Sequence, residues 1–557
     1  MTDAAATAAS SRARAATGSL LLAGVVLAVL TEAIAGTALS LGRDAIIGDT
    51  HATPDEFAWL DFGYVALKMI GFMIAPWLTT RINARSLVII ATFAMGTVSA
   101  LAAMTAGLEI LVVLRMIQGF CGGALLVAGQ VAIFLAYPHA RQPLLQACFA
   151  MGSVVAPASL APAVEGWLLD TLSWNWIFLC IVPLVLAAIG ILLLADAPPS
   201  PQIARRPFDW IGALLSSAGL FSVTFVLSQG SRWDWFEEPH ILWLAVLGVA
   251  SMLGFLARQA FAGAHGLIRF TPFGVEDFSF AFIVSFVAGA ALFGSAFVIP
   301  IFARGVLAFT YTEVGTLLLP GAAVFSGSLL IAAFFFQVCR VPPIATVPFG
   351  ILMIMTAMWM LSGTTSESGA GDMMAAVLLR GFGLGFLFLS ITLTAFMKLD
   401  SQNLASGIAL FNAGRQLGGL IGVAVLETLI DHHVAGNVSV LGASVSAGMP
   451  AVGERLTALR SALAEHGLEA ATAGRAAMAL LDRALIGEST VIAFNAAFNA
   501  VALLFVFAAP CLIAIKMILH RAHHQATAHA AVLAPAEVDV SLGGDPSQGL
   551  PERAAAE

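Results

Sequence analysis

Apolar stretches long enough to cross a lipid bilayer recur along the whole chain, and they limit its possible folds more than any other feature. Fourteen such stretches, 19 to 28 residues long, are separated by charges or by glycine and proline clusters. A helix needs roughly 20 apolar residues to span the hydrocarbon core. The chain is therefore predicted to be an all-α polytopic membrane protein with 14 transmembrane helices. The predicted spans are 18–40, 58–79, 87–106, 109–135, 144–169, 175–195, 209–228, 239–257, 276–302, 312–335, 343–362, 373–397, 404–430 and 489–516.

The composition excludes a water-soluble protein. Of 557 residues, 59% are hydrophobic and only 10% are charged, whereas soluble proteins carry about 25% charged residues. The formal net charge is −8 and only three lysines are present, so no nucleic-acid partner is expected. The lipid bilayer is the expected surrounding of this chain.

The distribution of basic residues predicts the orientation. If the N-terminus is cytoplasmic, the short outer loops receive only Arg43, Arg232 and Arg304. Cytoplasmic loops carry an excess of Lys and Arg, so this pattern favours an even number of spans with both termini in the cytoplasm. The basic residues then assigned to cytoplasmic segments are Arg12, Arg14, Arg81, Arg85, Arg141, Arg205, Arg206, Arg258, Arg269, Arg340, Lys398, Lys516 and Arg521.

The fourteen spans divide into groups of six, two and six. An acidic outer loop is expected over 41–57, and a long outer loop over 431–488 with one or two amphipathic helices. The predicted parts are a cytoplasmic N-terminal tail (1–17), a six-helix bundle (18–195), two additional helices with cytoplasmic connectors (196–275), a second six-helix bundle that includes the long periplasmic loop (276–516), and a disordered cytoplasmic tail (517–557).

Two helices show an internal repeat. The segment ILVVLRMIQGFCGGALL (110–126) is similar to AAVLLRGFGLGFLFLSI (375–391): both have Leu-Arg near the start, then glycines, then bulky apolar residues. Each is the fourth helix of its six-helix group. Duplicated halves are typical of secondary transporters, in which the substrate site lies between the halves near the bilayer midplane.

Charged residues inside predicted spans are candidate functional residues. A charge at the bilayer centre costs roughly 2.5–3.5 kcal/mol on insertion scales, so such residues usually face a cavity or a partner. Asp61 and Lys68 are seven residues apart and could pair, although Asp61 could instead reach the membrane surface. The residues that we single out are Glu32, Asp61, Lys68, Arg115, Glu165, Arg380 and Arg415.

Polar residues next to these charges are candidates for a cavity lining. Each lies within four residues of a charge on the same predicted helix. They are Tyr64, Gln118, Asn412 and Gln416. Gly414, Gly418 and Gly422 repeat every four residues, a stripe that lets another helix approach closely.

Four stretches resemble the major facilitator superfamily, in particular its fourteen-helix drug:proton antiporter branch of the multidrug-resistance protein B type. LRMIQG (114–119) resembles the family's fourth helix, and LFNAGRQLGGLIGVAVLETL (410–429) its thirteenth. WLDFGYVALKMIGFMIAPWL (59–78) looks like the second helix, and APAVEGWLLDTLSWNWIFLCIVP (161–183) like the fifth-helix antiporter motif and the segment after it. The resemblance covers nearly the whole chain and implies the major facilitator fold, with two six-helix bundles plus two extra helices.

This resemblance implies a proton-coupled secondary active exporter of amphipathic organic compounds, of the multidrug efflux type that confers antibiotic resistance. It would work by alternating access in the bacterial inner membrane. Glu32, Asp61 and Glu165 are then the proton-coupling candidates, with Lys68, Arg115, Arg380 and Arg415 as charge partners. No cofactor is implied, since the chain has no Walker P-loop. Exporters of this type often work with a periplasmic adaptor and an outer-membrane channel, which the 431–488 loop could contact.

The chain departs from the family pattern in three motifs. On the first helix, Thr31 takes the position of the family's aspartate and Glu32 is the next residue, about 100° further around the helix. In the loop PWLTTRINARSL, Thr80 stands where an aspartate is expected, while Arg81 and Arg85 remain as the predicted conformational loop. In the antiporter motif, Ala161 and Glu165 replace glycines. These changes affect the coupling chemistry rather than the fold.

Other functional classes remain open. A membrane-embedded enzyme would need a catalytic constellation, but the sequence has no HExxH or GxSxG motif, and we do not expect an enzyme. The five cysteines form no CxxC motif, so no metal site is expected. A non-transporting receptor or scaffold on a transporter fold is compatible with the altered Thr80 loop, and so is an exporter of one specific native metabolite.

Overall fold

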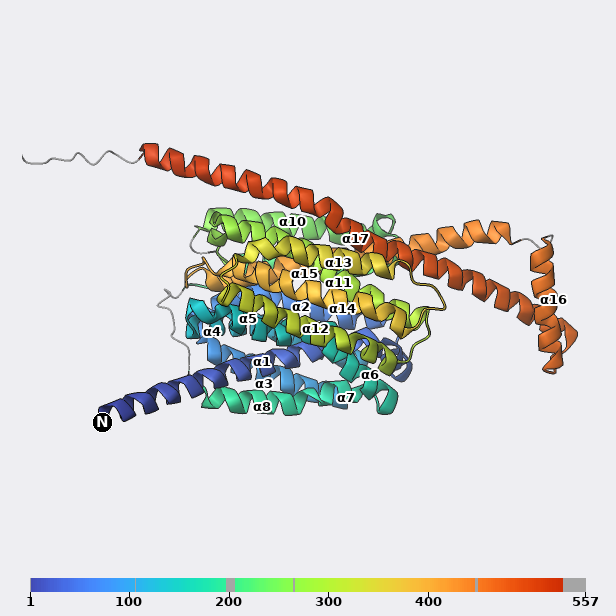
Figure 1. Cartoon of the computed structure of the whole chain (residues 1–557), viewed down its shortest axis with the longest axis horizontal. Coiled ribbons are helices and arrows are strands. Elements are labelled where there is room, and N and C mark those ends of the chain that lie inside the picture. Colours follow the sequence, from blue (N-terminus) through green and yellow to red (C-terminus); the bar gives the residue numbers. More distant parts are fainter. Residues whose placement is uncertain (1, 106, 197–205, 264–265, 446–448, 534–557) are drawn as a thin grey trace, which may run out of the picture.

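The computed structural model describes residues 2–105, 107–196, 206–263, 266–445 and 449–533, and over these residues the chain forms helices and no strands. Fourteen helices are long and apolar enough to cross a membrane, and most of them lie side by side in one bundle (Figure 1). The prediction of an all-α protein with fourteen transmembrane helices is confirmed.

The helices form two groups of six spans, with α9 and α10 between them in sequence. The first group consists of α1 (Thr2–Thr50), α2 (Pro54–Arg81), α3 (Ala84–Met104), α4 (Leu108–Ala136), a fifth span made of α5 (Gln142–Ala150), η2 (Met151–Leu160) and α6 (Ala161–Thr171), and a sixth made of α7 (Asn175–Leu179) and α8 (Ile181–Leu194). The extra pair is α9 (Trp210–Gln229) and α10 (Pro239–Ala262). The second group consists of α11 (Glu276–Gly305), α12 (Tyr311–Gln337), η7 (Pro343–Thr346) with α13 (Val347–Leu361), α14 (Ala370–Phe396), α15 (Leu404–Ser444) and α17 (Ala470–Leu533), with α16 (Pro450–Glu465) before the last span.

The bundle has two ends: the Arg81 end, where α2 finishes, and the Asp44 end, where α1 finishes. In Figure 1 the N-terminus lies on the left, at the Arg81 end, and α16 projects on the right, beyond the Asp44 end.

The first connection is shorter than the predicted loop 41–57. Helix α1 continues to Thr50, and α2 begins at Pro54 behind a capping box formed by Thr53 and Glu56. The extension is helical because it packs against the bundle, where Leu41 and Ile46 are buried. A capping box satisfies orphan N–H groups at a helix start, so only three residues are needed to reverse the chain.

The predicted loop 431–488 and both predicted tails also contain more helix than expected. Helix α15 runs to Ser444 and α17 begins at Ala470, so these helices project past the bundle at the Asp44 end (Figure 1). Helix α1 begins at Thr2, and α17 continues to Leu533. The segment 520–533 has no Gly or Pro and is rich in Ala, a strong helix former. The rest of the predicted disordered tail, 534–557, lies outside the described residues.

The fifth span is not a plain helix. Its middle, η2, is a ten-residue π-helix that contains Pro157 and packs against α1 and α12. Proline has no N–H to donate and disturbs the regular α-helical ladder. π-segments inside helices occur frequently at functional sites, and this one lies where the two groups of six spans meet.

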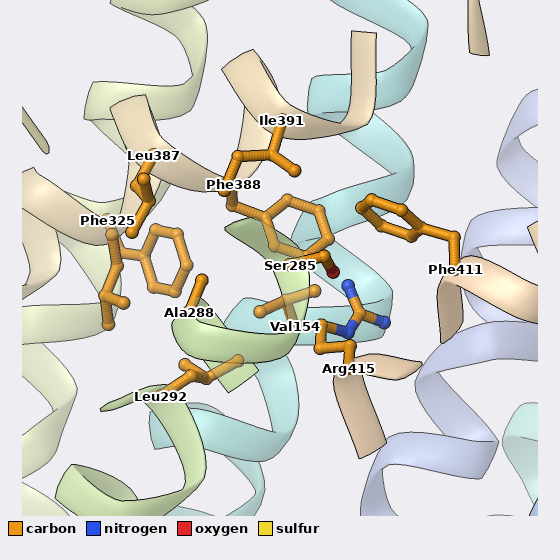
Figure 2. Close-up of a pocket in the computed structure, with 11 residues that line it drawn as sticks. Val154, Ser285, Ala288, Leu292, Phe325, Leu387, Phe388, Ile391, Phe411 and Arg415 are labelled. Carbon is orange, nitrogen blue, oxygen red and sulfur yellow. The ribbon is translucent and has the colours of Figure 1, made fainter. Parts of the chain in front are cut away.

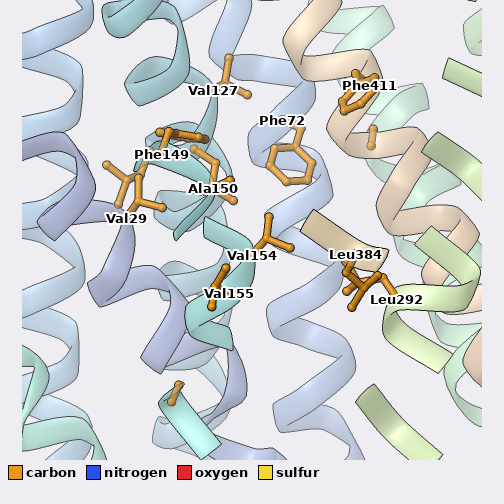
Figure 3. Packing of buried hydrophobic residues seen from close by; sticks show 14 of the residues in the cluster. Val29, Phe72, Val127, Phe149, Ala150, Val154, Val155, Leu292, Leu384 and Phe411 are labelled. Carbon is orange, nitrogen blue, oxygen red and sulfur yellow. The ribbon is translucent and has the colours of Figure 1, made fainter. Parts of the chain in front are cut away.

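Glycines allow the closest helix pairs to form in both halves. A Cβ atom at Gly119 of α4 would collide with the backbone carbonyl of Tyr64 on α2, and one at Gly418 of α15 would collide with that of Phe286 on α11. Small residues let membrane helices approach each other closely. Around these pairs, apolar side chains from both halves, including Phe72, form one core (Figure 3).

Candidate functional site

A buried carboxylate on α1, Glu32, is the centre of a polar cluster in the first half. Its side chain is almost fully buried, its Oε1 lies 2.5 Å from Lys68 Nζ, and the same oxygen accepts a hydrogen bond of 2.9 Å from the Tyr64 hydroxyl. Tyr64 and Lys68 are four residues apart on α2 and therefore lie on one helix face. Gly122 of α4 lies opposite, and a Cβ there would come within 2.9 Å of Glu32 Cγ. Three helices thus hold one ion pair.

The structure brings Lys68 to Glu32 rather than to Asp61. Asp61 lies nearer the Asp44 end of α2 and is exposed. In the part of the chain that the structure describes, no ion pair joins Asp61 to a basic residue. Asp61 and Lys68 are seven residues apart, about two helical turns or some 10 Å along the axis, so one helix keeps their charges apart.

Arg115 on α4 is fully buried beside this cluster. Its Nη1 donates to the carbonyl of Ala35 on α1 at 2.6 Å and to Gln118 Oε1 at 3.1 Å. Gln118 in turn donates to Ser99 Oγ at 2.8 Å. The guanidinium carbon lies 4.3 Å from the centroid of the Tyr64 ring, a cation–π arrangement. Among the described residues, Nε and Nη2 of Arg115 have no hydrogen-bond partner.

A second buried carboxylate, Glu165, lies on α6 just after the π-helix. It is fully buried, and its Oε1 accepts a hydrogen bond of 2.6 Å from Thr37 Oγ1 on α1. Its other oxygen, Oε2, has no partner within the described part of the chain. Glu165 therefore contacts α1 at Thr37, five residues after Glu32 on the same helix.

Arg380 on α14 repeats the placement of Arg115 in the second half. Its Nη2 lies 3.5 Å from the carbonyl of Leu292 on α11, the first helix of that half, and its Nε donates to Ser295 Oγ at 2.8 Å. Over the described ranges, no carboxylate forms an ion pair with Arg380, although it is almost fully buried. Each half therefore has a buried arginine that contacts a carbonyl of its first helix. The first half also has the ion pair of Glu32 and Lys68, whereas Arg380 has no such ion pair beside it among the described residues.

Arg415 on α15 points into a small cavity between the halves (Figure 2). Its Nη2 donates to Asn412 Oδ1 at 2.6 Å. Its guanidinium carbon lies 4.9 Å from the centroid of the Phe388 ring and 5.9 Å from that of Phe411. Gln416, the next residue, is half-buried and does not line this cavity.

The cavity is apolar except for one hydroxyl and one cation. Its volume is about 20 Å³, enough for a single water molecule and far too small for an organic substrate. The first half contributes Val154 of the π-helix, and the second half contributes the rest of the lining. The lining residues are Val154, Ser285, Ala288, Leu292, Phe325, Leu384, Leu387, Phe388, Ile391, Phe411 and Arg415.

Contacts between the halves close the Asp44 end. Arg304 Nη2 on α11 lies 3.3 Å from Asp44 Oδ2 on α1, and its guanidinium carbon lies 3.6 Å from the centroid of the Tyr311 ring. The Thr312 amide donates to Asp170 Oδ2 at 2.7 Å. The connection between α11 and α12 is thus bound to two helix ends of the first half.

The halves also contact each other at the Arg81 end. The rings of Phe134 on α4 and Phe396 on α14 meet edge to face with centroids 5.8 Å apart. Contacts at both ends and a small central cavity are the features of an occluded conformation.

The sequence matches a known protein family over most of its length. A sequence model described as the Major Facilitator Superfamily matches residues 21–423. The chain belongs to this superfamily. Members of the superfamily are transporters, so this major facilitator protein is a transporter and not an enzyme.

Relatives of this major facilitator protein include two that carry the name EmrB. The Multidrug export protein EmrB of Haemophilus influenzae is 26% identical over 73% of this chain and 79% of its own length. The Colistin resistance protein EmrB of Acinetobacter baumannii is 25% identical over 74% of this chain and 80% of its own. The MFS-type transporter YhcA of Bacillus subtilis is 23% identical, over 77% and 79%. The two EmrB matches support the multidrug-resistance protein B type within the superfamily.

Solved structures share the major facilitator fold. A bacterial homolog of the human lysosomal transporter Spinster, in an inward-facing and unoccupied conformation, has a TM-score of 0.55 at 15% identity and covers 91% of this chain and 98% of its own. The human organic anion transporter MFSD10 has a TM-score of 0.52 at 12% identity, over 74% and 93%. At these identities the likeness concerns the fold alone.

The predicted conformational loop of this major facilitator protein lies at the Arg81 end. Arg81 Nη2 donates to the carbonyl of Arg206 at 2.7 Å, and Arg85 Nη2 lies 3.3 Å from the carbonyl of Leu193. Arg85 therefore contacts the last turn of α8, and Arg81 contacts the residues just before α9.

Sequence reasoning missed several residues around the site. Glu427 on α15 is a half-buried carboxylate inside the predicted span 404–430, and its charge alone could have identified it. Thr37 and Ser295 hold buried charged groups, but hydroxyls are common in membrane helices and give no such signal. Phe388 faces Arg415 only because α14 and α15 meet in the fold.

Proposed function

We propose that this transporter is a proton-coupled exporter of amphipathic organic compounds that works by alternating access. The observation that carries the proposal is the ion pair between Glu32 and Lys68, buried at the centre of the first half. Ionisable residues inside a membrane protein form proton relays and substrate pathways. Glu32 also attracts the opposite charge of Arg415 in the second half. The charge of Glu32 therefore acts on residues of both halves.

A proton on Glu32 would change the contacts of this boundary. Protonation removes the negative charge, and with it the attraction to Lys68, which is strong because the carboxylate is shielded from water. A rocking movement that separates the halves would then become easier. Deprotonation toward the other side of the membrane would restore the pair and the closed boundary. Glu165 and Asp61 are the next candidates for carrying the proton.

The cavity lining supports an amphipathic substrate. Phe325, Phe388 and Phe411 offer aromatic surfaces, and Arg415 offers a single charge. Ligand sites with mostly apolar walls and a few placed polar groups suit such compounds. The names of the relatives from Haemophilus influenzae and Acinetobacter baumannii point in the same direction. We further propose an inner-membrane location with both termini cytoplasmic, so that α16 and the projecting parts of α15 and α17 face the periplasm and can meet an adaptor.

Transport in inverted membrane vesicles tests the proposal. In vesicles acidified inside by respiration, a transported compound should accumulate and protons should leave, as reported by a pH-sensitive dye. Accumulation without proton release would contradict the coupling. Accumulation of one metabolite from a broad panel would favour a specific exporter, and binding without accumulation a receptor.

A further inference from the structure

A second pocket lies between the halves at the Arg81 end. It has a volume of about 30 Å³. Its walls come from the last turns of α2, from the two connectors that flank α9 and α10, and from the start of α15. The lining residues are Pro76, Trp77, Thr79, Thr80, Arg206, Gly266, Leu267, Arg269, Gln402, Ala405 and Ser406.

The charge of this basic pocket is not balanced. Among the residues that the structure describes, two arginines line it and no carboxylate does. The Arg269 guanidinium donates to neutral oxygens, the carbonyl of Gln402 at 3.4 Å and its Oε1 at 3.3 Å. In the described part of the chain, the Arg206 guanidinium has neither an ion pair nor a hydrogen bond. Arg81, which donates to the Arg206 carbonyl, adds a third positive charge at the rim.

Acidic residues nearby do not compensate these charges. Asp209, three residues after Arg206, lies 3.3 Å from Arg258 and caps the start of α9 through Gly212. Thr80 stands where the resemblance leads one to expect an aspartate, and its hydroxyl donates to the Trp77 carbonyl. The pocket therefore lacks the one acid that this position would have supplied.

Aromatic side chains connect the pocket to the lipid-facing surface. The Trp77 and Phe208 ring centroids are 4.7 Å apart, and those of Phe208 and Trp210 4.6 Å. Trp210 is 77% exposed. Tryptophan is enriched at headgroup level in membrane proteins, so the pocket lies at the depth of the polar headgroups rather than of the acyl chains.

We propose that this basic pocket binds a phosphate-type anion, held by Arg206 and Arg269 and bridging the two halves. Arginine is suited to phosphate because its planar group donates parallel charge-assisted hydrogen bonds, and basic pockets between membrane helices bind anionic lipid headgroups. The phosphate comes either from a lipid or from a soluble phosphate compound. Bound there, it links α2 to α15 and stabilises the closed Arg81 end. This inference concerns binding alone and does not depend on what the transporter carries.

Lipid retention on the purified full-length protein tests the lipid source. The protein is exchanged into micelles with phosphatidylglycerol or phosphatidylcholine, and bound lipid is counted by native mass spectrometry. Arginines near an anionic lipid attract its headgroup, so Arg206→Gln with Arg269→Gln should weaken phosphatidylglycerol binding about tenfold or more. Thr80→Asp, which keeps both arginines and adds a carboxylate, should weaken it similarly. Arg141→Gln removes an exposed cation outside the pocket and should change nothing.

Thermal unfolding in lipid-free detergent tests the soluble source. Inorganic phosphate, compared with chloride at equal ionic strength, should raise the Tm of the wild type but not of Thr80→Asp if a soluble anion is the ligand. Selective retention of phosphatidylglycerol without this Tm effect assigns the site to a lipid. If neither ligand distinguishes the wild type from Thr80→Asp and from the double arginine variant, the proposal is overturned.

Discussion

At the scale of single residues, the first half holds a buried pair of opposite charges, whereas the buried Arg380 of the second half depends on neutral groups. Glu32 and Lys68 form an ion pair, and Arg115 lies over the Tyr64 ring. Arg380, by contrast, is bound by a hydroxyl and a carbonyl. Removing one partner of a buried ion pair is expensive because it leaves the other charge uncompensated. A proton-dependent change is therefore expected in the first half.

Glu32→Gln should abolish gradient-driven export while substrate binding persists. Glutamine keeps the size and the hydrogen bond to Tyr64 but cannot take up or release a proton. Export is measured in acidified inverted vesicles and binding by equilibrium dialysis. Glu109→Gln at an exposed position is the control. Normal proton-coupled export by Glu32→Gln would move the proton site to Asp61 or Glu165.

Arg415→Ala should weaken substrate affinity about 10- to 100-fold. Hydrogen bonds to charged groups contribute about 1.5–3 kcal/mol, and among the described residues Arg415 is the one charged residue that lines the central cavity. The apparent KM for export in vesicles measures the change, with protein quantity checked by immunoblot. Arg455→Ala, an exposed arginine of α16, is the matched variant. An unchanged KM would exclude Arg415 from the substrate site.

At the scale of helices, two helices can approach each other closely where a glycine of one faces the backbone of the other. Gly119 opposes the backbone of Tyr64, whereas nothing lies within 4 Å of a Cβ at Gly190 on α8. Both are glycines in membrane helices, and only the partner helix distinguishes them. The contact of α4 with α2 also positions Tyr64 and Lys68 toward Glu32, so helix packing and the polar cluster are coupled.

Gly119→Ala should destabilise the protein, and Gly190→Ala should not. The added methyl of Gly119→Ala forces α2 and α4 apart, and overpacking typically costs about 1–3 kcal/mol. Gly190→Ala gains helix propensity without a clash. Thermal unfolding of the two purified variants measures the difference, and equal Tm values would show that α2 and α4 are less tightly packed than described.

At the scale of the whole molecule, two similar halves are closed against each other at both ends. The Asp44 end is held by polar contacts of Arg304 and Thr312, and the Arg81 end by packed aromatic rings. A central cavity sized for one water means that substrate can enter only after one end opens. The alternating-access proposal therefore predicts that each end separates once in every cycle.

Fixing the Asp44 end should stop transport reversibly. Asp44→Cys combined with Arg304→Cys, bridged by a short cleavable bis-thiol reagent, should lose export in vesicles and regain it on reduction. The single variant Asp44→Cys, treated in the same way, should keep exporting. Full activity of the bridged protein would contradict opening at this end.

Reporter fusions test the orientation of the whole chain. The excess of arginine in alternate connections predicts that fusions after Ser200 and after Ala522 both lie in the cytoplasm. An outward signal at the second point would contradict an even number of spans across the membrane.

The sequence by itself determined the number of spans, the repeat and the superfamily, because membrane insertion depends on local apolar length and the motifs are contiguous. It also marked Glu32, Lys68, Arg115 and Arg415, since a charge in an apolar span is conspicuous wherever it points. Which charges meet was decided only by tertiary structure. Lys68 contacts Glu32 because α2, α4 and α1 approach at glycines. The basic pocket likewise exists only where α2, two connectors and α15 converge, since residues far apart in the sequence become neighbours through packing alone.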